Sequence, residues 1–130
     1  MENKTRKKAL ILQENSIMTN MRALGQQAEK IVENHYKGLG YQLLERNYTI
    51  PGGELDLIFD TGEEIIFIEV KRVDFMQDFD YMIAPSKIAL LERTIDQYSY
   101  KRAIEKPVRL DVVFVKNDQI LEKYENVTGT

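Results

Sequence analysis

The segment Glu54-Leu55-Asp56-Leu57-Ile58-Phe59-Asp60 is followed closely by Ile65-Ile66-Phe67-Ile68-Glu69-Val70-Lys71, and these two stretches decide the fold. The first alternates acidic and apolar residues, which is typical of a half-exposed strand. The second is rich in β-branched and aromatic residues, which strands favour. Thr61-Gly62-Glu63 lies between them and predicts a hairpin loop. The sequence therefore predicts an antiparallel pair of strands that carries acidic residues on both arms.

Side-chain parity places Asp56 and Glu69 on one face of this hairpin. If the loop has four residues, Asp56 falls directly opposite Glu69, and if it has two, Asp56 lies one diagonal step away. Both registers direct the two carboxylates to the same face, because side chains along a strand alternate with a period of two. Lys71 follows Glu69 by two residues and shares that face. The hairpin therefore predicts a cluster of two acids and one lysine.

Like charges that oppose each other on a sheet are destabilising, so this cluster needs a compensating charge. A divalent cation between Asp56 and Glu69 would supply it, and so would the ammonium of Lys71. Two acids and the backbone carbonyl of Val70 suit magnesium or manganese, which polarises a phosphate and acidifies a bound water. Lys71 would orient that water, and Glu29 on the preceding helix is a further candidate ligand. The alternative is that Glu69 and Lys71 form an ordinary solvated ion pair.

The rest of the chain predicts one α/β domain, with a mixed central sheet flanked by helices. Residues 1–20 form a basic N-terminal arm or a short helix, and residues 21–125 form the single domain. Arg109 and Asp111 lie on a buried strand and predict a structural ion pair. In chain order the expected elements are a helix at Met21–Lys37, strands at Tyr41–Tyr48, Glu54–Asp60 and Ile65–Lys71, a helix at Ser86–Ile104, a strand at Val108–Val115 and an edge strand at Gln119–Tyr124.

Composition excludes several function classes. The 130 residues include no cysteine and one histidine, so a disulfide scaffold, a thiolate zinc site and a cysteine nucleophile are ruled out. The net charge of −3 does not indicate nucleic-acid binding by itself, but basic residues predominate from Ser86 to Arg109. The apolar run near the start of the chain, Ala9-Leu10-Ile11-Leu12, is too short for a signal peptide or a membrane span. We therefore expect a cytoplasmic protein with no membrane contact.

The two segments of the hairpin resemble the PD-(D/E)XK signature of the nuclease superfamily. More closely, the chain resembles the YraN-like family of small bacterial proteins, which is akin to archaeal Holliday junction resolvases. The resemblance extends from about Arg22 to Val115, and its joint spacing is specific although each piece is weak. The matching segments are Gly25-Gln26-Gln27-Ala28-Glu29, Gly40-Tyr41 through Arg46-Asn47, Gly53 through Ile58, Phe67 through Lys71, Lys87, and Arg109-Leu110-Asp111-Val112-Val113.

The resemblance implies a restriction-endonuclease-like fold and a metal-dependent endonuclease that acts on DNA, on branched or damaged structures in particular. It implies that Asp56 and Glu69 are metal ligands, that Lys71 is the catalytic lysine and that Glu29 is an auxiliary acid. The chain departs from the family pattern after Lys71. The family usually places an arginine two residues after this lysine, whereas here Arg72 follows Lys71 immediately and Val73 takes the expected place.

Four basic residues are expected to contact nucleic acid: Lys87, Arg72, Lys101 and Arg102. The acidic segment from Asp74 to Asp80 would repel phosphates, which argues against DNA docking on that side. Two alternatives therefore remain open. One is a nucleic-acid-binding module that does not cleave, and the other is an interaction protein that binds a basic partner through Asp74 to Asp80. A homodimer is also left open.

Overall fold

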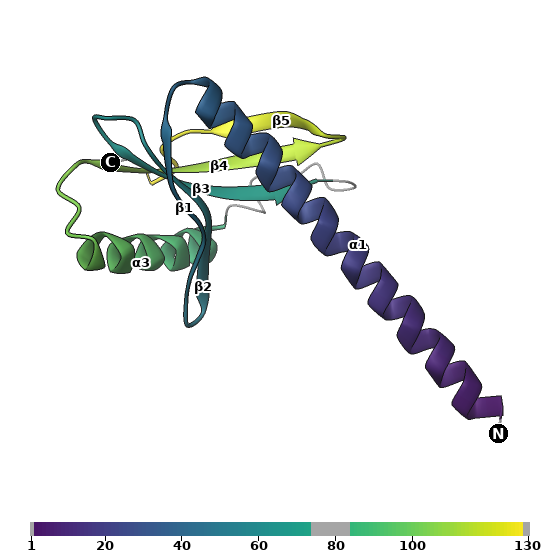
Figure 1. Cartoon of the computed structure of the whole chain (residues 1–130). Helices are drawn as coiled ribbons and strands as arrows, with labels where there is room; N and C mark the ends of the chain where they lie inside the picture. The colour runs from purple at the N-terminus through teal and green to yellow at the C-terminus, as the bar shows by residue number, and fades with distance from the viewer. Residues whose placement is uncertain (1, 74–83, 129–130) are drawn as a thin grey trace.

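The computed structural model describes residues 2–73 and 84–128. Two helices and five strands form an α/β domain with a mixed sheet (Figure 1), as the sequence predicts, and the architecture is that of the restriction-endonuclease-like fold. In chain order the elements are α1 (Glu2–Gly38), β1 (Gln42–Ile50), β2 (Gly53–Asp60), β3 (Ile65–Arg72), α3 (Pro85–Lys101), β4 (Val108–Lys116) and β5 (Gln119–Tyr124).

The strands lie in the sheet in the same order as in the chain, from β1 to β5. All neighbouring strands are antiparallel except β3 and β4, which run parallel. A parallel pair needs a long crossover, and α3 lies in the chain between these two strands. The crossover places α3 against one face of the sheet, next to the hairpin of β2 and β3.

The two helices cover opposite faces of the sheet, and each encloses its own hydrophobic core. On one face α1 packs Ala28, Val32 and Tyr36 against alternate residues of β2, β3 and β4. On the other face α3 packs Leu91, Ile95 and Tyr98 against the intervening residues of the same strands. Strands buried on both faces read as continuous apolar runs, which explains the composition of β3 and β4.

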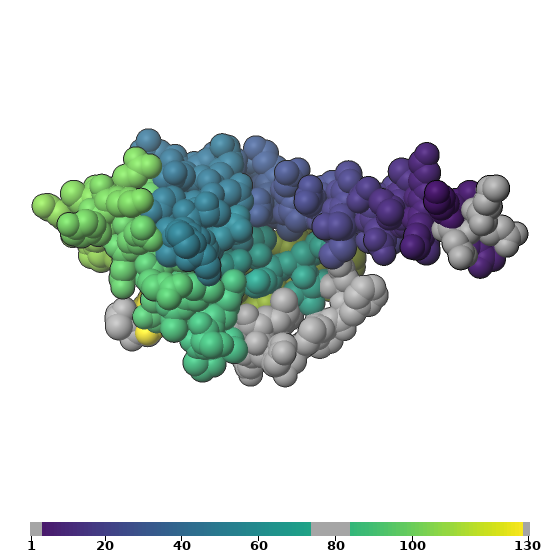
Figure 2. All heavy atoms as spheres, turned by 90° about the horizontal axis from the view of Figure 1, so that it is seen from below, coloured from purple at the N-terminus to yellow at the C-terminus, as the bar shows by residue number. Residues whose placement is uncertain are grey.

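The first helix is much longer than its apolar pattern indicates. The expected helix at Met21–Lys37 is the C-terminal half of α1, which begins at Glu2 and continues without a break. Residues 4–24 are exposed and extend away from the sheet, as Figures 1 and 2 show. Within the segment 1–20, for which the sequence leaves an arm or a short helix open, residues 2–20 thus form part of this helix. No helix in the described ranges is long and apolar enough to cross a membrane.

The second helix ends earlier than expected. The prediction carried it to Ile104, but α3 ends at Lys101, and the amide of Arg102 then donates to the carbonyl of Tyr98. Ala103 adopts a left-handed backbone conformation with φ of 51°, which a helix cannot accommodate. The left-handed residue Ala103, which lies before Pro107, therefore marks the end of this helix. The predicted strands agree with the observed ones to within two residues.

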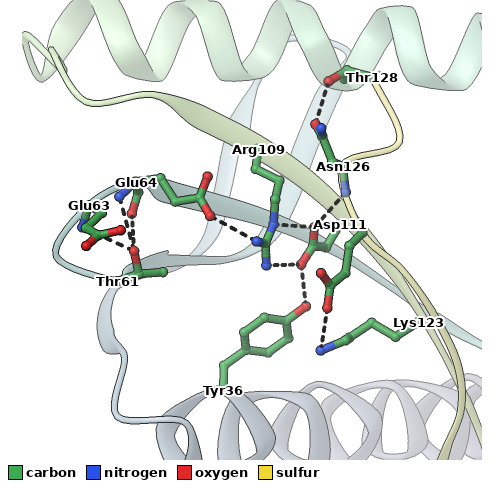
Figure 3. A network of polar contacts seen from close by, with 10 residues as sticks. Tyr36, Thr61, Glu63, Glu64, Arg109, Asp111, Lys123, Asn126 and Thr128 are labelled. Carbon is green, nitrogen blue, oxygen red and sulfur yellow. Dashed lines mark hydrogen bonds and ion pairs between the residues drawn. The ribbon is translucent and has the colours of Figure 1, made fainter. Parts of the chain in front are cut away.

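Asp111, a fully buried aspartate, accepts hydrogen bonds from three parts of the chain (Figure 3). Asp111 on β4 accepts hydrogen bonds from the hydroxyl of Tyr36 on α1 at 2.7 Å and from the amide of Asn126 at 3.0 Å. Arg109 binds the same carboxylate with Nε at 2.9 Å and Nη2 at 3.0 Å. This confirms the structural ion pair predicted for Arg109 and Asp111. Because every donor is well placed, the buried charge is compensated.

Candidate active site

The hairpin of β2 and β3 has the register with the four-residue loop. Asp60 pairs with Ile65, and the ladder continues to the pair of Leu57 and Ile68. The backbone ladder stops there, and the side chain of Asp56 takes its place: Oδ2 of Asp56 accepts a hydrogen bond from the amide of Val70 at 2.7 Å. The N–H and C=O of one strand residue point to the same side. The carbonyl of Val70 is therefore also directed toward Asp56.

Glu69 lies beside Asp56 in the same buried corner, with 7% of Glu69 and 8% of Asp56 exposed. Two lysines approach it: Nζ of Lys71 lies 3.8 Å from Oε1, and Nζ of Lys87 lies 3.9 Å from Oε2. Both distances exceed a hydrogen bond, and Oε2 of Glu69 is buried with no hydrogen-bond partner among the described groups. A carboxylate oxygen buried in this way lacks the compensation that Asp111 has.

Both carboxyl groups of this pair are shifted toward the protonated form. Burial, followed by the charge of Glu69, raises the pKa of Asp56 from 3.8 to about 7, against the opposing effect of the hydrogen bond from Val70. Burial also raises the pKa of Glu69, and the nearby charges of Lys71 and Lys87 oppose that rise. Two acids with raised pKa values in one corner make that corner a candidate functional site.

Glu29 joins the pair from the neighbouring helix. Burial and the charge of Asp56 raise the pKa of Glu29 to about 7, so the helix brings a third carboxyl group to this corner. The side-chain amide of Asn47 on β1 lies 3.4 Å from both carboxylate oxygens of Glu29. The structure thus brings together four of the predicted residues: Asp56, Glu69, Lys71 and Glu29.

The sequence did not single out Asn47 and Glu54 as parts of this site. The amide of Asn47 also lies 3.4 Å from Oε1 of Glu54, and it bridges Glu54 to Glu29. Asn47 has a positive φ of 51° at the place where β1 passes Asp56. Asparagine tolerates this conformation better than most residues, which is a usable signal. Glu54 precedes Asp56 by two residues, so its acidity also marks this end of β2.

The basic residues expected to contact nucleic acid are spread over the domain. Lys87 lies in the first turn of α3, beside Glu69. Lys101 is fourteen residues further along, about 21 Å at 1.5 Å per residue. Arg102 pairs with Glu45 at 3.2 Å and stacks over the ring of Tyr98 at 5.5 Å. Arg72 lines a pocket on the side of α1. The acidic segment Asp74 to Asp80 lies outside the described residues.

Close packing of the turn between β1 and β2 keeps α3 against the hairpin. A Cβ atom at Gly53 would overlap with the hydroxyl of Thr94 and press on the side chain of Ile50. The turn therefore approaches the helix more closely than any other residue would allow. This contact lies about two helical turns beyond Lys87, so it helps to fix the helix end that points at Glu69.

The donor set fits a hard divalent cation. In the parts of the chain that the structure describes, no three acidic or histidine side chains form a ready-made metal cluster. Magnesium, however, is commonly held by only one or two carboxylates together with water and substrate phosphates. Asp56, Glu69 and the carbonyl of Val70 provide such a set, and the unpartnered Oε2 of Glu69 is an oxygen that a cation would satisfy.

Fold and site together define a small restriction-endonuclease-like protein with a buried pair of carboxylates flanked by lysines. The sequence profile of the uncharacterised protein family UPF0102 matches residues 28–115, and the chain belongs to this family, which is the YraN family of the sequence resemblance. Among similar proteins is a UPF0102 protein of Carboxydothermus hydrogenoformans, 32% identical over 117 residues, which cover 83% of this chain and 97% of that protein.

Two further UPF0102 proteins are similar to most of this chain. A UPF0102 protein of Neisseria meningitidis serogroup C is 38% identical over 93 residues, which cover 69% of this chain and 81% of the relative. One of Thermotoga petrophila is 35% identical over 98 residues, which cover 72% of this chain and 87% of the relative. The family profile begins at residue 28, so the exposed half of α1 lies outside it.

Proposed function

We propose that this protein is a metal-dependent nuclease that hydrolyses phosphodiester bonds in DNA, with branched or damaged structures as its substrate class. One observation carries the proposal. Two buried carboxylates converge where the ladder between β2 and β3 ends, and one of their oxygens has no partner among the described groups. A bound ligand would complete such an uncompensated pair. Magnesium or manganese is the ligand that this chemistry suits.

Asp56, Glu69 and the carbonyl of Val70 would hold the cation, which supplies polarisation of the phosphate and an acidified water. Lys71 is 29% exposed, so its ammonium can reach a substrate while it stays close to Glu69. It would donate a hydrogen bond to the attacking water or to the oxygen that gains charge. Lys87 is 36% exposed and approaches Glu69 from α3, where it would contact a neighbouring phosphate. Glu29 would accept a hydrogen bond from the same water.

The test is a titration of magnesium and manganese by isothermal calorimetry on the wild type and on Asp56→Asn. The same samples are then given branched and single-stranded DNA. The matched control is Asp60→Asn, on the same strand, which removes a surface carboxylate paired with Lys106 at 2.8 Å. We expect metal binding and cleavage in the wild type and in the control, and neither in Asp56→Asn.

The other outcomes separate the alternatives. Metal binding without cleavage of any DNA would favour a nucleic-acid-binding module that keeps the site but does not hydrolyse. No metal binding by the wild type would refute the proposal and leave Asp56 and Glu69 as a cluster with a structural or interaction role. Equal loss in Asp56→Asn and Asp60→Asn would show that the effect is not specific to the carboxylate pair.

A further inference from the structure

The exposed half of α1 carries an apolar stripe that none of the described contacts covers. Six large side chains, each 40–58% exposed, follow helical spacing along it: Leu10, Ile11, Ile17, Met18, Met21 and Leu24. At 100° per residue they fall within an arc of about 140° of the helix circumference. The stripe continues toward Ala28 and Val32, which α1 buries against its own sheet. The same helix face is thus buried in one half and exposed in the other.

We infer that two copies of this chain pair through the apolar stripe, with their α1 helices antiparallel. Each of the six side chains exposes about half of its surface, so the stripe offers on the order of 500 Å² of apolar area, and a symmetric pair buries about 1,000 Å², the lower bound for a specific interface. Residues spaced by seven, such as Leu10, Ile17 and Leu24, repeat along it. That repeat is typical of helices that pack side by side.

Charge selects the antiparallel orientation. In a parallel pair, Glu14 within the stripe would face its own copy, and the basic residues Arg6, Lys7 and Lys8 would all lie together. In an antiparallel pair centred between Ile17 and Met18, residues whose numbers add up to about 35 lie level. Glu14 then comes level with Met21 of the second copy and next to its Arg22.

Shape supports the same register. Gly25 lies inside α1 and within the stripe, and a Cβ atom there would meet nothing within 4 Å. Glycine inside a helix is less favourable than alanine, so a close approach by another chain would explain its presence here. In the antiparallel register Leu10 of one copy lies level with Gly25 of the other. The bulky side chain thus meets the open position.

The far end of the stripe meets a pocket on the sheet. A pocket of about 220 Å³ lies where α1 reaches the ends of β3 and β4, and it is lined by Leu24, Ala28, Arg72, Val115, Asn117 and Asp118. In this register Arg6, Lys7 and Lys8 of a second copy come level with the pocket, where the stripe ends because the sheet covers the face of α1 that carries Ala28 and Val32. The carboxylate of Asp118 offers them an opposite charge. Figure 2 shows the N-terminal half of α1 extending past the body of the domain.

The first test measures the mass of the full chain by analytical ultracentrifugation across a concentration series. We expect a dimer for the wild type and a monomer for the double variant Ile17→Glu/Met21→Glu. The matched control is Leu12→Glu: Leu12 is 62% exposed but lies on the opposite side of the helix from the stripe, and its variant should stay dimeric. The circular dichroism spectrum of each variant should match the wild type, because the stripe does not contact the core.

The second test measures orientation. The chain has no cysteine, so Lys8→Cys carries a single spin label. In the antiparallel pair, position 8 lies level with position 27 of the second copy, which separates the two labels by about 30 Å, whereas a parallel pair brings them within about 15 Å. A monomeric wild type, a dimer that Ile17→Glu/Met21→Glu leaves intact, or the short label distance would each overturn the inference. Monomers that bind anionic phospholipid vesicles through the stripe would also overturn it, in favour of a membrane surface.

Discussion

The same substitution at two buried aspartates should change stability in opposite directions. Asp56 and Asp111 are 8% and 0% exposed, but only Asp111 has a full set of donors. Asp56 accepts one backbone hydrogen bond and lies against Glu69. In the absence of metal, Asp56→Asn should therefore stabilise the fold, and Asp111→Asn should destabilise it.

The pKa of Asp56 sets the size of the first effect. A rise from 3.8 to about 7 amounts to about 3 pH units, or at most ~4 kcal/mol at 1.36 kcal/mol per unit. Water can reach the carboxylates when the hairpin relaxes, so we expect about 2 kcal/mol. The folded-state pKa is raised, so the destabilisation is present above about pH 7 and disappears as the pH falls toward 4. The gain in stability from Asp56→Asn should therefore also be present above about pH 7 and disappear as the pH falls toward 4.

The second effect comes from breaking a compensated ion pair. Asparagine at position 111 removes the charge that Arg109 binds and turns an acceptor into a donor that faces other donors. Removing one partner of a buried ion pair typically costs about 3–5 kcal/mol. We therefore expect Asp111→Asn to lower the melting temperature by more than about 10 °C at pH 8.

Thermal and urea unfolding at pH 8 and pH 4 in a chelating buffer measures both effects. Asp56→Asn should melt about 6–10 °C above the wild type at pH 8 and at the same temperature at pH 4. The chelator is essential, because a bound cation would stabilise the wild type and hide the difference. A loss of stability in Asp56→Asn at pH 8 would refute the reasoning, because it would make the carboxylate pair a favourable contact rather than an uncompensated one.

Three further predictions concern the surroundings of the site. Arg46 and two lysines lower the pKa of Glu33 from 4.5 to about 2, so Glu33→Gln should cost about 2 kcal/mol in urea unfolding at pH 7, and the difference should shrink as the pH falls below about 4.5. Gly53→Ala should cost about 1–3 kcal/mol in the same assay, because its methyl group would overlap with the hydroxyl of Thr94. Lys71→Ala should keep metal affinity in calorimetry and lose cleavage; unchanged turnover would remove this lysine from the mechanism.

The sequence predicted the pair at the centre of the site because strand parity is local. Once β2 and β3 form a hairpin, the face of Asp56 and Glu69 follows from counting residues. Contacts between distant elements were harder to predict. Glu33 is an ordinary acidic residue in a helix by sequence, yet it is 2% exposed and bound by Arg46 of β1. Nothing in its periodicity indicates which side chain will reach across to it.

Helix length was hard to predict for a related reason. The pattern for the first helix rested on residues that α1 buries against the sheet, and these begin at Ala28. The preceding residues do not pack against the core of their own domain, so their sequence shows no pattern of positions buried in it. The apolar side chains of this half were visible in the sequence, but their alignment along one face appears only when the helix is traced from Glu2.

The hydrogen bond from Asn126 to Asp111 bears on where the domain can be cut. The family profile stops at residue 115, which suggests a fragment that ends with β4. Such a fragment would leave Asp111, the most deeply buried charge among the described residues, without one of its donors. It would also lose Val127, whose amide binds the carbonyl of Leu110 and whose side chain packs on the core beside α3. The shortest piece that folds should therefore extend to residue 128, past the last strand and past the boundary that sequence similarity draws.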